Sequence, residues 1–173
     1  SKSLSLVQYS VLANREGEDY AQSLTISFLK LSFIITFLIT LVLLILPGTF
    51  YGWLFGGQEF QKIPELILLL SPGILAVSIN NSISHYFAGK GLQRINAIGS
   101  LLGFSGTVIA GLLLVPVWGL NGAAITSSIA HVAGTVFMIY IFIKKTQIKV
   151  SDFWPKKADV DLVKKMLLNR KNK

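Results

Sequence analysis

The polar side chains between residues 71 and 90 are the part of this sequence best suited to do chemistry, because they lie in a segment of membrane-spanning length. At helical spacing, four of them fall on one side of a helix: Ser78, Asn81, Ser82 and His85. Unpaired polar groups cost free energy in hydrocarbon, so a helix wholly surrounded by lipid is not expected to carry them. We take these four as candidate substrate-cavity residues. The alternative, a buried face bonded to neighbouring helices, stays open.

His131 is a fifth candidate for the same cavity. It belongs to a row at four-residue spacing, Ser127, His131 and Thr135, near the middle of a later apolar segment. An ionisable side chain at this depth normally faces a bundle interior or a water-filled cavity. His131 could therefore contact a ligand or a proton inside a transport pathway, or bridge two helices as a neutral imidazole.

The sequence indicates neither a catalytic centre nor a metal site. Glu65 is the only carboxylate in the apolar segments, and it lies at the end of one. At 1.5 Å rise per residue, the depths of His85 and His131 differ by roughly 10–15 Å, too far to share an ion about 2 Å from each nitrogen. The chain has no cysteine and no glycine-rich phosphate loop. We expect no enzyme activity and no cofactor.

Composition places these residues in an all-α integral membrane protein. Hydrophobic residues make up 52% of the chain and charged residues only 14%, and the mean hydropathy is +0.62. The apolar residues are gathered in blocks, which predicts four transmembrane helices within 24–143. Their expected ranges are 24–46, 63–88, 95–115 and 120–143.

The remaining segments are polar or mixed. Residues 1–23 are expected to form a cytoplasmic loop after a helix that lies upstream. Lys30, early in the first span, is expected to extend to the near interface. The loop 47–62 mixes aromatic residues with glycine, which is typical of an interfacial segment. Residues 144–173 are expected to form a basic cytoplasmic tail, part of which is amphipathic enough to lie on the bilayer.

Small residues recur at four-residue spacing in the third and fourth spans. The third has Gly99, Gly103, Thr107 and Gly111, and the fourth has Gly122, Thr126, Ala130 and Gly134. Small side chains let helix backbones approach closely. We therefore expect the two spans to pack against each other or against other helices, although glycine is also common in membrane helices generally.

Charge sets the expected orientation. The turn with Lys90 and Arg94 is basic, and from Lys144 onward there are ten Lys or Arg residues against three Asp. The positive-inside rule places this turn and the tail in the cytoplasm, where Lys90 and Arg94 would flank an entrance. The tail would attract anionic lipid headgroups. No nucleic-acid-binding fold surrounds these charges, so we expect no nucleic-acid partner.

The run 115–126, VPVWGLNGAAIT, resembles the Pro-x-Tyr-Gly-x-x-Gly-Ala-Ala-x-Ala-Thr signature of polysaccharide and O-antigen flippases. Upstream, LFGGQEF is similar to the Leu-Phe-Gly-x-x-Phe/Tyr loop of the same family, and Trp118 stands where tyrosine is usual. These proteins belong to the multidrug/oligosaccharidyl-lipid/polysaccharide flippase superfamily. The resemblance covers about residues 1–145.

The resemblance implies a four-transmembrane-helix fragment of a larger helical-bundle transporter with two pseudo-symmetric halves. Such a transporter would move a lipid-linked oligosaccharide, carried on a polyprenyl diphosphate, across the inner (plasma) membrane by alternating access. Its partners would be that substrate, membrane lipids and the N-terminal half of the transporter, which is missing here. Two alternatives stay open: a drug/cation antiporter of the same superfamily, and a non-transporting four-helix membrane scaffold.

Overall fold

The computed structural model describes residues 18–146 and 148, and these residues form helices and short connections with no strand. The elements are α2 (Glu18–Ile45), α3 (Gly48–Phe55), the 3-10 helix η1 (Gln58–Lys62), α4 (Ile63–Gly89) and α5 (Gln93–Thr146). Proline and glycine mark the ends of several: Pro47 precedes α3, and Gly56 follows it with a φ of 78°, a conformation that glycine adopts readily.

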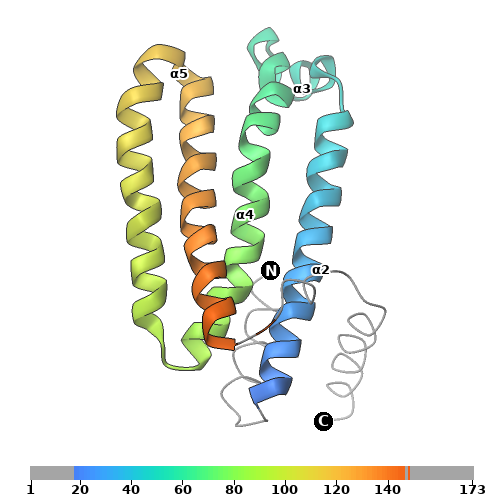
Figure 1. Ribbon diagram of the computed structural model, residues 1–173. Helices are drawn as coiled ribbons and strands as arrows, with labels where there is room; N and C mark the ends of the chain where they lie inside the picture. The colour runs from blue at the N-terminus through green and yellow to red at the C-terminus, as the bar shows by residue number, and fades with distance from the viewer. Residues whose placement is uncertain (1–17, 147, 149–173) are drawn as a thin grey trace, which may run out of the picture.

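The 54-residue helix α5 consists of two antiparallel arms (Figure 1). A straight helix of this length would extend about 81 Å, far beyond the ~30 Å thickness of a bilayer core. Gly119, with φ 53° and ψ −123°, leaves the helical conformation and reverses the chain. Only glycine adopts such a conformation without strain. We call residues 93–118 the first arm and residues 120–146 the second arm.

The chain is therefore an all-α membrane protein. Among the described residues, three helical stretches are long and apolar enough to cross a membrane: Ala21–Ile45, Gln58–Gly89 and the two-armed Gln93–Thr146. With α5 folded at Gly119, the described part of the chain forms four long helical rods. The rods extend somewhat beyond the expected spans, because each helix continues a few residues past its apolar centre at one end or both.

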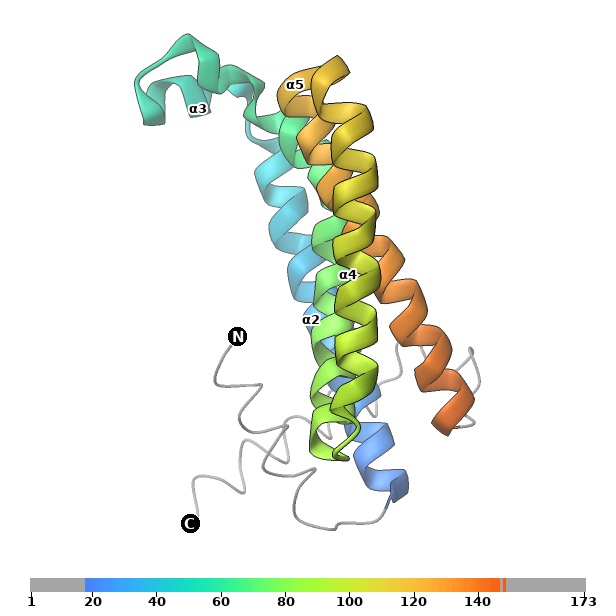
Figure 2. The ribbon, with the colours of Figure 1, turned by 90° about the vertical axis from the view of Figure 1, so that its left-hand side faces the viewer.

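In Figure 1 the helical segments stand side by side in the order first arm, second arm, α4 and α2, and Figure 2 shows the lower part of the second arm leaving this layer to one side. Helix α4 is central and contacts both α2 and α5. The second arm and α4 run in the same direction, opposite to the first arm and α2 (Figure 1). A single layer leaves large surfaces of each helix free for lipid or for further helices.

The tightest packing lies at one end of the layer, where α2, α4 and the second arm meet. The core there consists of Ala21, Ile26, Leu29, Ile83, Tyr86, Phe87, Met138 and Phe142. Phe142 packs edge-on against Tyr86 and Phe87, with ring centroids 5.1 and 6.3 Å apart. Such edge-to-face aromatic pairs add stability beyond the apolar area that they bury.

The rest of α2 separates from this core and exposes apolar side chains around much of its circumference, among them Ile35, Phe37 and Leu38. The Thr40 hydroxyl bonds within the helix: its Oγ1 donates to the Thr36 carbonyl oxygen at 2.8 Å. This surface suits hydrocarbon, because its exposed side chains are apolar. Lys30 is buried, next to Leu29 of the core where α2 packs against its neighbours.

Two predicted segments lie mostly outside the described residues. They are the loop 1–23, described only from residue 18, and the basic tail 144–173, described only at 144–146 and 148.

Candidate functional site

Helix α4 carries four of the predicted cavity residues, and the structure separates them by burial. Ser78 and Ser82 are buried, and the Ser78 hydroxyl donates to the Leu75 carbonyl oxygen of its own helix at 2.8 Å. Asn81 is exposed and His85 is half-buried. Successive helical residues point about 100° apart, so the border between packed and free surface passes between Asn81 and Ser82.

A second polar group joins α4 to the first arm, and its member Asn96 was not singled out from the sequence. Asn96 Nδ2 donates to the Ser84 carbonyl oxygen at 2.9 Å. The side-chain oxygens of Asn80 and Asn96 are buried and have no hydrogen-bond partner within the described part of the chain. Buried amide oxygens normally have a hydrogen-bond partner, so each of these two oxygens can still accept a hydrogen bond. The sequence feature that could have indicated Asn96 is a polar asparagine at the start of an apolar span.

His131 is exposed on the second arm, between the two sides by which this arm packs. Its neighbours Ser128 and Thr135 bond to α4, the latter by donating to the Ala76 carbonyl oxygen at 3.0 Å. Its neighbours Ala130 and Gly134 instead lie against the first arm. The second arm thus contacts α4 on one side and the first arm on another. His131 lies between these two sides and faces the space between the first arm and α4.

Asn81 lies on the same side of the layer as His131. The first arm and α4 meet across that space through the bond from Asn96 to Ser84. Asn81, three residues before Ser84, shares that side of α4. The bond from Thr135 to Ala76 places these two residues at the same depth. Asn81 follows Ala76 by five residues along α4, and His131 precedes Thr135 by four residues along the second arm. The depths of Asn81 and His131 therefore differ by roughly 13 Å at 1.5 Å per residue. We call Asn80, Asn81, Ser84, Asn96 and His131 the polar face.

Above the polar face, the Ser128 hydroxyl is inserted into the backbone of α4 next to Pro72. Ser128 Oγ accepts a hydrogen bond from Gly73 N–H at 3.3 Å and donates one to the Leu69 carbonyl oxygen at 2.6 Å. The two α4 groups are four residues apart, so they are the pair that a regular helix would bond to each other. Pro72 has no N–H to donate to the Leu68 carbonyl oxygen, which accepts a hydrogen bond from the Ser71 hydroxyl of the same helix at 2.8 Å instead. The Ser128 hydroxyl bonds the next pair of backbone groups along α4. These two bonds lock the second arm to α4 next to Pro72.

The predicted small-residue rows lie at the contact between the two arms. A Cβ on Gly134 would lie 3.1 Å from the Gly99 carbonyl oxygen, and one on Gly103 would lie 3.3 Å from that of Ala130. Residues at four-residue spacing do not stay on one side of a helix, however, because four residues turn it by 400° rather than 360°. Thr107 is consequently exposed, and Gly106 and Ala110 take its place at the contact.

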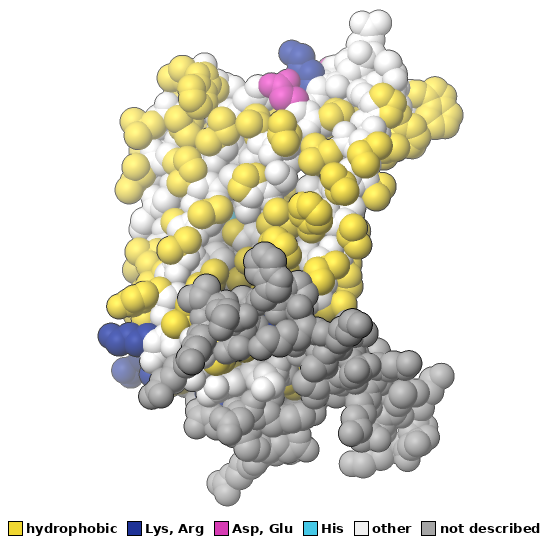
Figure 3. Space-filling view, turned by 45° about the vertical axis from the view of Figure 1, so that its right-hand side comes forward, with side chains coloured by type: hydrophobic (Ala, Val, Ile, Leu, Met, Phe, Trp, Pro, Cys, Tyr) yellow, Lys and Arg dark blue, Asp and Glu magenta, His cyan; other side chains and the backbone are white. Residues whose placement is uncertain are grey.

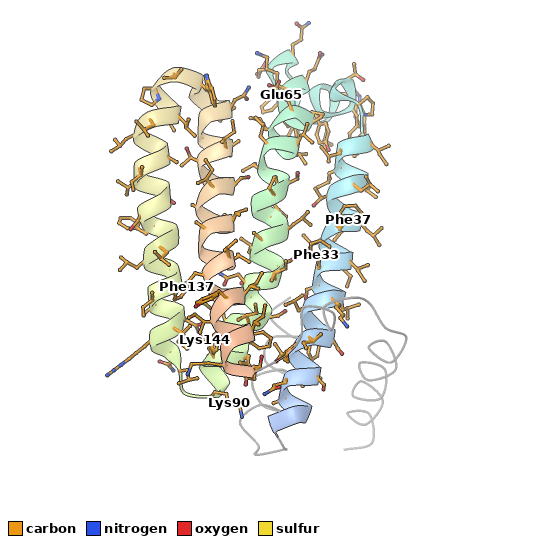
Figure 4. The ribbon with its side chains drawn as sticks, in the orientation of Figure 1. Phe33, Phe37, Glu65, Lys90, Phe137 and Lys144 are labelled. Carbon is orange, nitrogen blue, oxygen red and sulfur yellow. The ribbon has the colours of Figure 1, made fainter. Side chains whose placement is uncertain are left out.

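The ends of the layer differ in charge (Figure 4). Lys90 and Arg94, the predicted entrance residues, are exposed at the turn between α4 and α5, at the same end as Lys144. Glu65 lies at the opposite end and accepts a hydrogen bond from Asn121 Nδ2 at 2.7 Å. This bond ties the bend of α5 to the start of α4.

The described part of the chain contains no group of three or more His, Cys, Asp or Glu residues that could hold a metal. Its polar features include amides, hydroxyls, one imidazole on the polar face and a cluster of cations at one end. Amides and hydroxyls can donate hydrogen bonds to phosphate and sugar oxygens and accept them from sugar hydroxyls.

Comparison with known proteins identifies the family. No curated protein sequence and no solved structure matches the chain. The family model described as "Lipid II flippase MurJ" matches residues 3–167. The resemblance noted above indicated the right superfamily, but the family that matches is not the polysaccharide and O-antigen branch. Because the match spans nearly the whole sequence, the chain belongs to the lipid II flippase MurJ family.

Proposed function

We propose that this chain is part of a transporter that flips a lipid-linked oligosaccharide across the membrane by alternating access. The observation that carries the proposal is the polar face itself. Asn81 and His131 are exposed on helices whose other exposed side chains are largely apolar. Such groups cost free energy when they face lipid. A hydrophilic substrate that passes along them would instead give them hydrogen-bond partners.

The family narrows the proposed substrate to lipid II or a closely similar lipid-linked precursor. Family membership favours this class over an O-antigen unit, which the resemblance in the sequence suggested. Both classes combine a polyprenyl diphosphate with a sugar, so the chemistry required of the protein is shared. Our proposal is that discrimination depends on the sugar.

Each polar residue then has a role. Asn81 can donate to a diphosphate or sugar oxygen and accept from a hydroxyl, and His131 offers the next contact along the path. Lys90 and Arg94 would attract the anionic diphosphate to the entrance, with His85 just inside it. Ser78 and Ser82, which are buried, lie on the packed side of α4 and do not line the path.

A single layer of helices cannot enclose such a substrate, so the proposed path requires further helices facing the polar face. We propose that they belong to the other half of the transporter, and that the two halves rock against each other. The transporter makes and breaks no covalent bond in this scheme, and it acts as a carrier rather than an enzyme. It lies in the plasma membrane, with Lys90, Arg94 and the tail in the cytoplasm.

Purified full-length protein in lipid vesicles should transfer fluorescent lipid II between leaflets. Asn81→Leu and His131→Leu should each slow transfer about tenfold, because each removes a hydrogen bond worth roughly 1.4 kcal/mol to a charged or polar substrate. The measurement is the fraction of lipid II accessible to an external, impermeant quencher over time. Ile129→Leu, an exposed apolar position on the second arm, is the matched control and should transfer normally.

Two outcomes of this experiment would contradict the proposal. If the wild-type protein moves an O-antigen lipid but not lipid II, the proposed substrate is wrong. If lipid II moves equally fast in all three variants, the polar face is not the path.

The orientation has its own test in intact cells. Gln58→Cys in η1 and Gln93→Cys at the start of α5 replace exposed glutamines at opposite ends of the layer. An impermeant thiol reagent added outside should label the first and not the second, because the basic turn is cytoplasmic. The reverse pattern would invert the proposed direction of transport.

A further inference from the structure

Helix α3 and η1 form a short hairpin that projects sideways from one end of the layer (Figure 2). The chain does not need this excursion to connect α2 to α4, because the two helices are neighbours. The hairpin is nevertheless firmly held. Its residues and their exposure indicate what it contacts.

Small residues and one tyrosine fix the hairpin. A Cβ on Gly48 would overlap the Gln61 carbonyl oxygen, and one on Gly52 would lie 3.2 Å from the Gly57 carbonyl oxygen, so α3 lies against the returning chain backbone to backbone. Tyr51 is buried, and its hydroxyl donates to the Leu43 carbonyl oxygen of α2 at 2.7 Å. The orientation of α3 is thus set by close contacts.

The opposite side of α3 presents large apolar side chains to the surroundings. Trp53 is 78% exposed, and Phe50 and Leu54 are also exposed. Phe55, exposed as well, lies on the side of Tyr51 and packs against Phe60 of η1 with ring centroids 5.3 Å apart. The returning segment of the hairpin, η1, exposes polar side chains: Gln58, Glu59 and Lys62. In Figure 3 basic and acidic side chains lie together at the top of the molecule, further basic side chains lie at its lower left, and hydrophobic side chains project at the upper right. The hairpin is therefore amphipathic.

The depth of the hairpin matches a membrane surface. It begins where the span ending at Ile45 stops and leads into α4. The bend of α5, with exposed Trp118, lies at the same end of the layer (Figure 1). Tryptophan is enriched at this level, where its ring sits among the headgroups.

We propose that the α3–η1 hairpin is an interfacial anchor that lies flat on the bilayer, at the end of the protein opposite Lys90. Phe50, Trp53 and Leu54 enter the region between headgroups and acyl chains, while η1 faces water. An amphipathic helix with its apolar side in this region is stabilised by the area that it removes from water. The apolar side of this hairpin contacts lipid, not another part of the protein. The anchor fixes the height of α2 and α4 in the membrane, whatever the transporter carries.

The fluorescence of Trp53 tests this assignment in the full-length protein in lipid vesicles, with every other tryptophan replaced by phenylalanine. Trp53 emission should shift to shorter wavelength relative to the unfolded protein. Lipids brominated near the headgroup end of the acyl chain should quench it more than lipids brominated at the chain end, and aqueous iodide should have little effect. The matched control combines Trp53→Phe with Gln58→Trp, which moves the probe to the polar side. Iodide should quench that variant strongly and brominated lipids weakly.

Two results would overturn the proposal. If iodide quenches Trp53 as strongly as it quenches the Gln58→Trp control, the hairpin lies in water. If neither iodide nor brominated lipid quenches Trp53, another protein segment covers it. Neither result depends on lipid II transfer, so the anchor can fail while the proposed function stands.

Discussion

Replacing Gly122 by valine is expected to abolish folding of the second arm against the first. A Cβ at this position would overlap the Leu114 carbonyl oxygen and lie 2.7 Å from its carbonyl carbon and 3.1 Å from the Val115 Cα. All three are backbone atoms, which cannot rotate away as a side chain can. The bend at Gly119 also holds the two arms together only three residues earlier. We expect a loss of about 3 kcal/mol or more, the upper end of overpacking costs.

The thermal midpoint of the purified full-length protein measures this effect. Gly111→Val is the comparison, because a Cβ there would be in ordinary contact, 3.6 Å from Thr126 Cγ2. Gly122→Val should yield little folded protein, while Gly111→Val should melt close to wild type. Equal midpoints in the two variants would mean that the arms do not approach at Gly122 as described.

The lock at Pro72 gives the second large effect. Gly73→Ala would place a Cβ 2.8 Å from the Ser128 Cα, forcing the second arm away and breaking both bonds of the Ser128 hydroxyl. Ser128→Ala removes the same bonds without adding bulk and should cost about 1–2 kcal/mol, because hydrogen bonds between membrane helices average about 0.6 kcal/mol and reach about 1.7. Gly73→Ala should therefore destabilise the protein more than Ser128→Ala.

Unfolding of the same protein in mixed detergent gives both values. Ser105→Ala is the control, since the Ser105 hydroxyl is on the surface and bonds only to the Leu101 carbonyl oxygen of its own helix. That variant should be within about 0.5 kcal/mol of wild type, as for other surface changes. If Ser128→Ala is equally neutral, the hydroxyl does not lock α4 to the second arm.

Hydropathy was sufficient to predict the helical rods and the class of the protein. Gly119 lies in a run that continues the helical pattern on both sides, yet the length limit set by the bilayer required a reversal near it. The excursion of α3 was harder to predict in detail. Its aromatic and glycine residues indicated an interfacial segment, but the contact of Gly48 and Gly52 with the returning chain depends on a fold that the sequence pattern does not describe.

Which polar residues are exposed could not be read from helical spacing alone. Asn81 and Ser82 are adjacent, and their different burial depends on where the first arm and α2 contact α4. The lock at Gly73 joins residues 55 apart in the chain, and no local pattern encodes such a contact. The family resemblance rested on a motif around the α5 bend. That motif describes a turn geometry and carries no information about the sugar, so it indicated the superfamily and not its lipid II branch.

Substrate protection of the polar face is the most direct test of the account. Single cysteines at Asn81, His131, Ile129 and Ser82 are introduced into the full-length protein lacking other cysteines. Each variant is then treated in vesicles with a charged, impermeant thiosulfonate, with and without lipid II. Only a thiol in water forms the reactive thiolate. Asn81→Cys and His131→Cys should react and be slowed by lipid II, while the Ile129 and Ser82 variants should not react. Equal rates at all four positions, or rates at Asn81 and His131 that lipid II leaves unchanged, would contradict a substrate path along this face.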